Sequence, residues 1–296
     1  MKNVLFAAAA LATVMGTPAL AADIALKAPP PPPAPVCAWC GWYIGLNAGG
    51  TWFNDNSVDT TTTNVSSIPG LGLNGNIGAA VAAQGTGSVS PGNGAFLGGA
   101  QIGYNRQYNN WVLGIEADFD GVAKRNRQGV LANAGFVPGS SLGPGPGGTF
   151  SSAGTITSSK NLYSLGTLRG RLGVLSTPTL LAYGTGGLAY GQVNTSTTIA
   201  ETLGFPDTPL PFGTAGSVST WRAGWTAGGG LEWLFAPKWS VKVEYLYYDL
   251  GRVTNNLPQI NQFGIFGTTL ETVSNSQSTT RFNGSIVRIG INTHFN

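Results

Sequence analysis

The sequence predicts an all-β fold, an eight-stranded antiparallel up-and-down transmembrane β-barrel with long extracellular loops and short periplasmic turns. Three observations lead to this prediction. Eight segments alternate apolar or small residues with polar ones, the connections between them are alternately long and short, and aromatic residues stand near both ends of the apolar faces. A period of two gives a strand two unlike faces, and rings at two levels are typical of the two interfaces of a bilayer.

The composition excludes several classes of protein. Only 9% of the 296 residues are charged and 45 are Gly, whereas roughly 25% of the residues of an ordinary soluble domain are charged. No run of about 18 apolar residues follows the N-terminal segment, which excludes a bundle of membrane-spanning helices. The formal charge of +3 comes without a basic cluster, so nucleic acid is not an expected partner.

Three regions follow one another along the chain. Residues 1–21 have the pattern of a secretory signal peptide, with Lys2, an apolar stretch and a small-x-small cleavage site. Residues 22–41 are expected to form a periplasmic Pro-rich linker, because APPPPPAP at 28–35 favours an extended polyproline II spacer. Residues 42–296 are expected to form the barrel.

The linker ends in a CxxC motif, Cys37 and Cys40. In an oxidising compartment the two thiols could close a small disulfide loop. A thioredoxin-like redox motif requires the pair at a helix N-terminus after a strand. Here a Pro-rich coil precedes the motif and a strand follows it, so redox catalysis is not expected.

The clearest strand pattern is a hairpin at residues 221–250. The odd positions are apolar or small from Trp221 to Phe235 and from Trp239 to Tyr247, and the turn Ala236-Pro237-Lys238 separates the two arms. Charged residues occupy the opposite face of the hairpin at Arg222, Glu232, Lys242 and Glu244. If the apolar face contacts lipid, these charges point into a closed barrel.

Six further strands are predicted at residues 42–53, 95–108, 111–122, 158–174, 180–193 and 281–295. The Gly-rich segment 180–193 leaves its facing open. The connections predicted to be long loops are 54–94, 123–156, 194–220 and 251–279. The connections after the second, fourth and sixth strands are short, as expected for turns on the periplasmic side when the N-terminus lies in the periplasm.

The aromatic residues sort into two levels by the same topology. At the periplasmic level we expect a girdle of Trp42, Tyr108, Trp111, Tyr183, Trp233, Phe235, Trp239 and Phe295. At the outer level we expect Trp52, Phe96, Phe119, Trp221, Trp225, Tyr247 and Phe282.

Charged residues on the inward faces predict a salt-bridge network. An eight-stranded barrel has an interior that side chains can fill, and buried charges are tolerated when they are paired. The predicted network is Glu116, Asp118, Asp120, Glu232 and Glu244 with Arg169, Arg171, Arg222, Lys242 and Arg288. It would plug the lumen, and the alternative is that it lines a narrow ion path.

Catalytic and metal-binding patterns are missing from the sequence. The one His is His294, near the periplasmic end of the last strand. Matches to GxSxG at 139–143 and GxGxxG at 70–75 lack the strand and helix that these motifs require. Two Cys and one His form no recognisable zinc spacing. We therefore expect a non-enzyme with no cofactor and no metal site.

One motif resembles a known family. After a Lys-Ala-Pro-Pro linker, the pattern W-x-G-x-Y-I-G-x-N-x-G reads Trp39, Gly41, Tyr43, Ile44, Gly45, Asn47 and Gly49. With TLRGRLG at 167–173, AYGTGGLAYG at 182–191 and the closing strand, it resembles the small porin-family barrels also called outer-membrane immunogenic or opacity-type surface proteins. The resemblance implies an abundant envelope protein exposed at the cell surface. Two departures are the final Asn296 after the aromatic Phe295, and the CxxC motif.

The favoured function is an integral outer-membrane barrel with a structural and surface-interaction role in a Gram-negative envelope. Its expected partners are outer-membrane lipid and lipopolysaccharide, the barrel-assembly machinery through the last strand, and an unidentified ligand of the loops. A passive small-solute pore is the first alternative. The second is a soluble lipocalin-like binder of an apolar ligand, which requires an apolar interior and a polar exterior.

Overall fold

The computed structural model describes residues 37–66, 74–123, 127–140, 148–204, 209–262 and 272–295. The chain divides into residues 1–36 and residues 37–296, and every described residue belongs to the second unit. The predicted signal peptide and residues 22–36 of the predicted linker lie outside the described residues. In the described ranges, no helix has both the length and the apolar character needed to cross a membrane.

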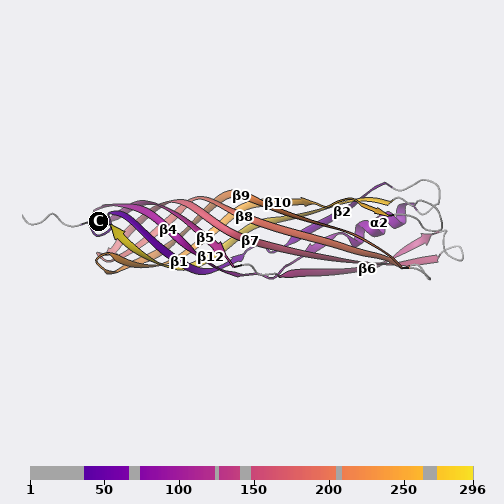
Figure 1. The fold of residues 1–296 in the computed structure, drawn as a ribbon, viewed down its shortest axis with the longest axis horizontal. Coiled ribbons are helices and arrows are strands. Elements are labelled where there is room, and N and C mark those ends of the chain that lie inside the picture. The colour runs from indigo at the N-terminus through magenta and orange to yellow at the C-terminus, as the bar shows by residue number, and fades with distance from the viewer. Residues whose placement is uncertain are drawn as a thin grey trace, which may run out of the picture. The chain divides into compact units, whose positions relative to one another are not determined.

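Eight antiparallel strands form a closed ring (Figure 1). The last strand returns to pair with the first, and Trp42 lies opposite Phe295 while Phe53 lies opposite Gly284. Closure pairs the backbone groups of both edges, which a bilayer requires because it offers no water to satisfy them. The predicted up-and-down barrel is confirmed. Its strands are β1 (Gly41–Phe53), β4 (Ala95–Tyr108), β5 (Trp111–Val122), β7 (Gly148–Thr177), β8 (Leu180–Gly204), β9 (Pro209–Ala236), β10 (Trp239–Asn256) and β12 (Thr272–Phe295).

The short turns all lie at one end of the ring, here called the turn end. They join β4 to β5, β7 to β8 and β9 to β10, which are the second, fourth and sixth strands of the ring and their successors. Asn109 in the first turn has a φ of 54°, a left-handed conformation that Asn tolerates better than most residues. Gly41 and Phe295 lie at the same end because β1 and β12 pair there.

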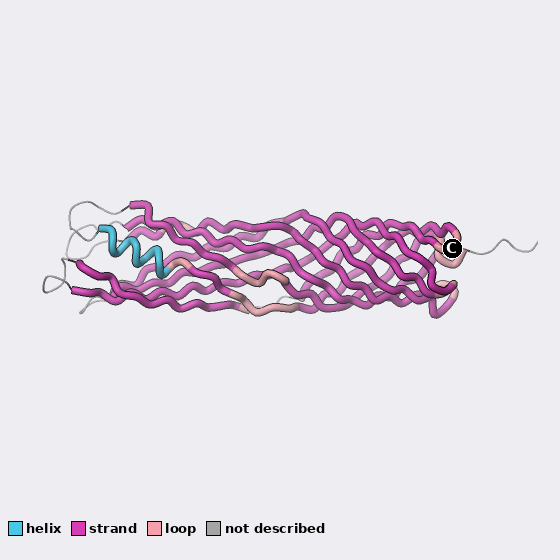
Figure 2. Tube along the Cα trace, turned by 180° about the vertical axis from the view of Figure 1, so that it is seen from behind, coloured by secondary structure: helices cyan, strands magenta, loops and turns pink. Residues whose placement is uncertain are grey.

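The predicted long loops are wrong over much of their length, because the strands continue far beyond the second aromatic level. β7 has 30 residues and β9 has 28. We call everything beyond Trp52, Phe119 and Trp225 the extension (Figure 2). It holds the far ends of β7, β8, β9, β10 and β12 together with β2 (Val58–Ser66), β3 (Gly87–Val89), β6 (Gln128–Ser140), β11 (Ile260–Gln262) and the helix α2 (Asn74–Gln84).

Local composition explains why these strands were missed. The segment 194–203 reads NTSTTIAETL, and its alternate residues Thr195, Thr197, Ile199 and Glu201 are buried. Thr favours strands, but hydroxyls on both faces hide the contrast between apolar and polar positions on which the pattern depends.

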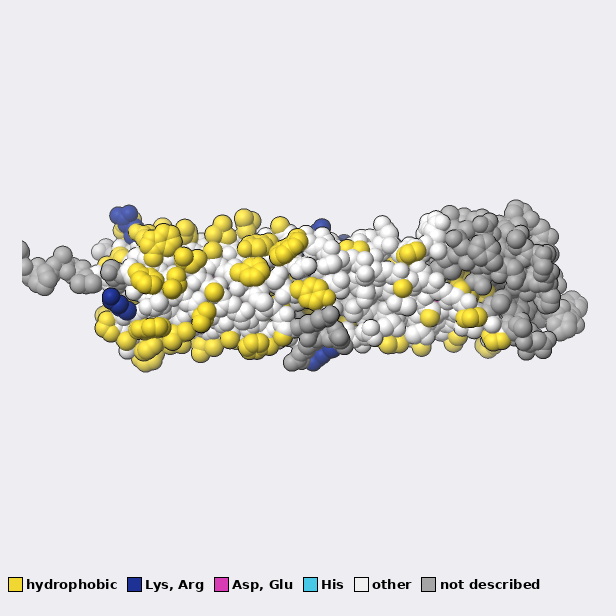
Figure 3. All heavy atoms as spheres, viewed as in Figure 1, with side chains coloured by type: hydrophobic (Ala, Val, Ile, Leu, Met, Phe, Trp, Pro, Cys, Tyr) yellow, Lys and Arg dark blue, Asp and Glu magenta, His cyan; other side chains and the backbone are white. Residues whose placement is uncertain are grey.

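Side-chain facing divides the molecule into two zones. Near the turn end large apolar residues point outward, and Leu46, Ile115 and Ile289 are 64%, 58% and 55% exposed. Figure 3 shows this apolar zone as a concentration of hydrophobic side chains, beyond which hydrophobic side chains are sparser. On β8, whose facing was open, Leu181, Tyr183, Ala189 and Val193 are buried, whereas Leu188 and Tyr190 are exposed.

Candidate functional site

The lumen between the two aromatic levels is filled by charged side chains. Nine of the ten residues predicted for the network are inside the barrel. Each is at most 5% exposed: Glu116, Asp118, Asp120, Arg169, Arg171, Glu232, Lys242, Glu244 and Arg288. The strand alternation positions them, because each occupies the face opposite an outward apolar neighbour.

Two arginines connect most of the carboxylates. Arg169 on β7 bonds Glu116 at 2.5 Å, Asp118 at 2.8 Å and Glu244 at 3.0 Å. Arg288 on β12 bonds Asp120 at 2.7 Å, Asp118 at 2.8 Å and Glu244 at 2.7 Å. Since β5, β7, β10 and β12 contribute to these contacts, the bonds cross the lumen and link strands that are not neighbours in the sheet.

Arg171 and Lys242 extend the network toward the turn end. Lys242 Nζ lies 2.8 Å from Glu116 Oε1, and Arg171 pairs with Glu232. The guanidinium of Arg171 also lies 3.8 Å from the ring centre of Tyr183, a cation–π contact that strengthens where water is excluded.

Two tyrosines complete this layer. Tyr43 donates to Glu116 at 2.6 Å, and Tyr183 donates to Glu244 at 3.0 Å. Their rings lie over Gly103 and Gly230 of neighbouring strands, where any Cβ would overlap them. The glycines therefore make room for aromatic rings inside a narrow barrel.

The prediction for Arg222 was wrong. Its Nη2 donates to the backbone carbonyl of Arg252 at 2.8 Å, at the outer aromatic level between Trp221 and Trp225 on β9, and within the described residues it forms no ion pair. The interior network therefore contains five acids and four bases. His294 lies beside the fifth acid, with Nε2 3.7 Å from Glu232 and 3.0 Å from Ser240 Oγ.

An apolar layer closes the lumen at the turn end. Trp39 is fully buried and packs in one cluster with the buried residues Val112, Leu181, Tyr183 and Leu234. Its Nε1 donates to the carbonyl of Pro178 at 3.0 Å, and its ring meets the ring of His294 edge-on at 5.9 Å. Cys37 and Cys40 are joined by a disulfide. The four-residue loop that it closes carries Trp39 into the mouth of the barrel.

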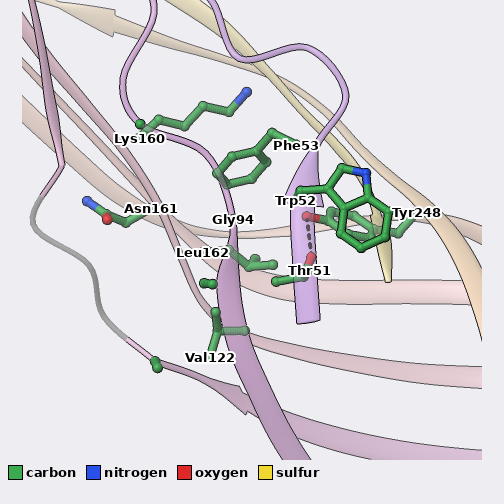
Figure 4. A pocket seen from close by; sticks show the side chains of 12 residues that line it. Thr51, Trp52, Phe53, Gly94, Val122, Lys160, Asn161, Leu162 and Tyr248 are labelled. Carbon is green, nitrogen blue, oxygen red and sulfur yellow. Dashed lines mark hydrogen bonds between the residues drawn. The ribbon is translucent and has the colours of Figure 1, made fainter. Parts of the chain in front are cut away.

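A second apolar layer closes the other end of the network. Its buried members are Leu97, Val122, Leu162, Leu165, Ala189, Val193, Leu246, Tyr248, Leu250, Val253, Phe282 and Ile286. A pocket bordered by Thr51, Leu162 and Tyr248 holds about 30 Å³ (Figure 4), which is room for one or two waters. Above it, Lys160 Nζ donates to the carbonyls of Asp55 and Arg281, both at 2.5 Å, and lies 4.4 Å from the Phe53 ring centre.

The aromatic girdles need two corrections. Tyr183 and Phe282 are 7% and 0% exposed and point into the lumen. The Gly-rich stretch of β8 hid the facing of Tyr183, and Phe282 lies where β12 leaves the membrane zone. Of the predicted girdle residues, those exposed at the turn end are Trp42, Tyr108, Trp111, Trp233, Phe235, Trp239 and Phe295. At the other level the exposed ones are Trp52, Phe96, Phe119, Trp221 and Trp225, with Tyr247 half-buried beside Trp225.

Sequence reasoning missed the two apolar layers. The available signal was Leu234 and Leu246, two apolar residues on a face that was otherwise polar. Trp39 gave no strand signal, because it precedes β1. The arrangement as a whole has charges within and apolar residues outside, which is the opposite of a lipocalin-like binder.

Within the described residues, the interior of the extension mixes hydroxyl groups with apolar side chains such as Val58, Ile156 and Ile199, and it includes the acid Glu201. Thr62 Oγ1 lies 2.8 Å from Ser276 Oγ, and Thr197 donates to Ser278 at 3.0 Å. Glu201 is 3% exposed, and within the described residues neither of its carboxyl oxygens has a hydrogen-bond partner. Burial raises the pKa of the Glu201 carboxyl to about 8.

The family model and the curated relatives that match this chain are outer-membrane proteins. Residues 7–267 match the family described as outer membrane protein beta-barrel domain. The chain is 32% identical over 307 residues to the 31 kDa outer-membrane immunogenic protein of Brucella melitensis biotype 1, with 100% of both chains covered. It is 26% identical over 301 residues to a 25 kDa outer-membrane immunogenic protein of Brucella abortus biovar 1, covering 100% of this chain and 99% of that one. The outer membrane protein OprG from Pseudomonas aeruginosa is 11% identical, with a TM-score of 0.37 over 86% of this chain and 97% of that chain.

Arg288→Met is expected to destabilise the barrel by about 3–5 kcal/mol, because it leaves Asp118, Asp120 and Glu244 without one of their cations in a site closed to water. The measurement is urea unfolding in phosphatidylcholine vesicles, with heat-modifiable gel migration as the readout of the folded fraction. The control Arg222→Met removes a guanidinium that lies outside the network and should cost less than about 1.5 kcal/mol. Equal costs for the two variants would show that the interior pairs do not hold the barrel.

Glu201→Gln is expected to stabilise the extension increasingly as pH rises. The folded pKa of about 8 lies above the unfolded value of about 4.3. Between these values the unfolded chain releases a proton that the folded chain keeps, so the wild type loses stability up to pH 8 and no more above it. Hydrogen exchange of the β8 amides at pH 5, 7 and 9 should show a growing advantage for the variant. The control Asp59→Asn changes an exposed acid of the extension, and a similar gain there would contradict the assignment.

Proposed function

The chain belongs to the outer membrane protein beta-barrel domain family, and from this premise we propose that it is a sealed barrel that anchors the extension in the outer membrane and displays it at the cell surface. The chain is an outer-membrane protein. In the proposed orientation the extension is extracellular and the turn end is periplasmic. The proposal includes cleavage of a signal peptide after Ala21.

Three layers of side chains, stacked along the barrel axis, support the proposal that the lumen is sealed. An apolar layer around Trp39, the ion-pair network and the apolar layer around Leu246 and Phe282 follow one another along the barrel. An ion crossing this path would have to displace paired charges and two apolar layers, and both are costly. This stack favours a plug over an ion path.

The proposed role is not enzymatic. His294 is 1% exposed and packs against Trp39 and Tyr43, so a substrate at the surface would not reach it. The partners in this proposal are the lipids around the apolar zone and lipopolysaccharide at the outer rim. The assembly machinery would recognise β12. Its outward residues form an apolar row of Val287, Ile289, Ile291 and Phe295.

Purified chain in planar lipid bilayers is expected to give no steady openings, because the three layers block the lumen. Single-channel recording at ±100 mV measures this, with a general porin as the positive control for insertion. Steady openings of large conductance would refute the sealed barrel and favour the passive pore.

Display at the surface predicts opposite labelling of two single-Cys variants on intact cells. Ala132→Cys, at an exposed position of β6, should react with a membrane-impermeant maleimide, whereas Thr179→Cys, in an exposed turn, should react only after permeabilisation. Cys37 and Cys40 are oxidised and do not interfere. The reverse labelling pattern would refute the proposed orientation, and the proposal of a sealed lumen would still be tested separately by the conductance measurement.

A further inference from the structure

The hydrogen-bonded ladder between β9 and β10 ends at the outer aromatic level. Their ladder runs from Trp239–Ala236 to Asp249–Trp225 and ends there. The outer ladders of the same two strands continue, since β8 pairs with β9 as far as Pro209 and β10 pairs with β12 as far as Asn256. Beyond Trp225, side-chain hydrogen bonds connect the two strands in place of backbone pairing.

A β-bulge in β10 lies at this point. The register with β12 shifts between Asp249 and Arg252, and Gly251 has a φ of +79°. Such bulges redirect the side chains that follow them. Here the result is that Arg252 stands directly opposite Arg281 on β12.

Two facing arginines repel one another, and like charges directly opposite on a sheet are destabilising. Asp249 forms an ion pair with only one of the two arginines, at 2.5 Å from Arg281 Nη2. The Arg281 side chain remains 45% exposed. Arg252 is exposed, and the described residues offer its guanidinium neither a hydrogen bond nor an ion pair. Arg222, which donates to the Arg252 carbonyl, has a buried Nε without a partner in the described ranges.

Asp249, Arg252 and Arg281, but not Arg222, border an open hollow of about 430 Å³ on the outside of the barrel. Ala223 and the two glycines Gly224 and Gly251 leave room in it, and Trp225 of the aromatic level lies beside it. The remaining lining is Asp249, Arg252 and Arg281. The hollow thus presents an excess of guanidinium groups next to an aromatic ring.

The height of the hollow matches the headgroup layer of a bilayer. Arg281 lies two residues along β12 from Asn283, which pairs with Asp249 at the level of Trp225. Two residues of a strand tilted by about 40° rise about 5 Å. The headgroup region extends about 5–7 Å beyond the hydrocarbon on each side.

We propose that Arg252 and Arg281, supported by Arg222, bind the phosphate group of a phosphorylated lipid headgroup in the outer leaflet. The guanidinium fork matches phosphate oxygens in a bidentate geometry. A phosphate between the two arginines removes their repulsion, and the lipid body lies beside Trp225. The inference rests on the proposed function for its orientation, because it requires this end of the barrel to face the outer leaflet.

The experiment uses the mature chain in phosphatidylcholine vesicles that contain diphosphoryl lipid A at increasing mole fraction. Bound lipid A is counted by native mass spectrometry after extraction in mild detergent. The double variant Arg252→Gln/Arg281→Gln should bind lipid A about tenfold more weakly or worse. The matched control Arg106→Gln/Lys238→Gln removes two bases at the turn end and should stay within about twofold of the wild type.

Further arms separate the sources of the anion. Dephosphorylated lipid A should bind about tenfold more weakly than the diphosphoryl form, and inorganic phosphate at equal concentration should not displace it. Equal loss in the control pair, equal binding of the dephosphorylated lipid, or displacement by inorganic phosphate would each overturn the site. If the double variant does not fold, Arg252→Gln alone tests it, since that exposed side chain has no described partner. A silent, correctly oriented barrel without lipid A selectivity would refute this inference and leave the sealed barrel that displays the extension standing.

Discussion

The structure depends on the requirement that charges inside a closed sheet be neutralised inside it. Lipid lies outside the barrel and apolar layers lie at both ends of the network. Within the described residues, the carboxylates of Glu116, Asp118 and Glu244 therefore have only the facing bases as counterions. Burying an ion pair is costly, and a pair is a weak source of net stability. Its geometric demand is strong, however, because each guanidinium needs its carboxylates at hydrogen-bond distance. Arg169 and Arg288 therefore fix the register and the width of the ring across the lumen.

The two apolar layers make that network possible. Coulomb attraction strengthens where water is excluded, and Trp39 at one mouth and the cluster with Phe282 at the other exclude it. The disulfide loop matters in the same way, since it positions Trp39, which belongs to no strand of the ring. Layers of this kind make an eight-stranded barrel a solid rod, whose function resides at its ends and on its outer wall.

The extension follows a different physical rule. Outside the bilayer a strand does not need an apolar outer face, and the ladders of β7, β8 and β9 continue with Thr, Ser and Gly on that face. Its interior combines hydroxyl pairs such as Thr62–Ser276 with buried apolar residues such as Ile156 and Ile199, and Glu201 is a buried acid there. Where the ladder between β9 and β10 ends, the change from one zone to the other leaves backbone and arginines at the rim. The proposed lipid site is located at this boundary.

The sequence by itself determined the ring, its topology and most of its facing. The bilayer imposes a period of two on residues such as those of β5, and Asn109-Asn110 marks a turn, so both can be recognised locally. The tertiary structure alone decided how far the strands of the extension run, because ladder hydrogen bonds leave no trace in a run of Thr and Ser. It also decided that Arg222 lies outside the network and that the side chains of Tyr183 and Phe282 lie inside the lumen. Such placements depend on which strands face each other across the barrel and on where a bulge shifts the register, and neither is a property of neighbouring residues in the chain.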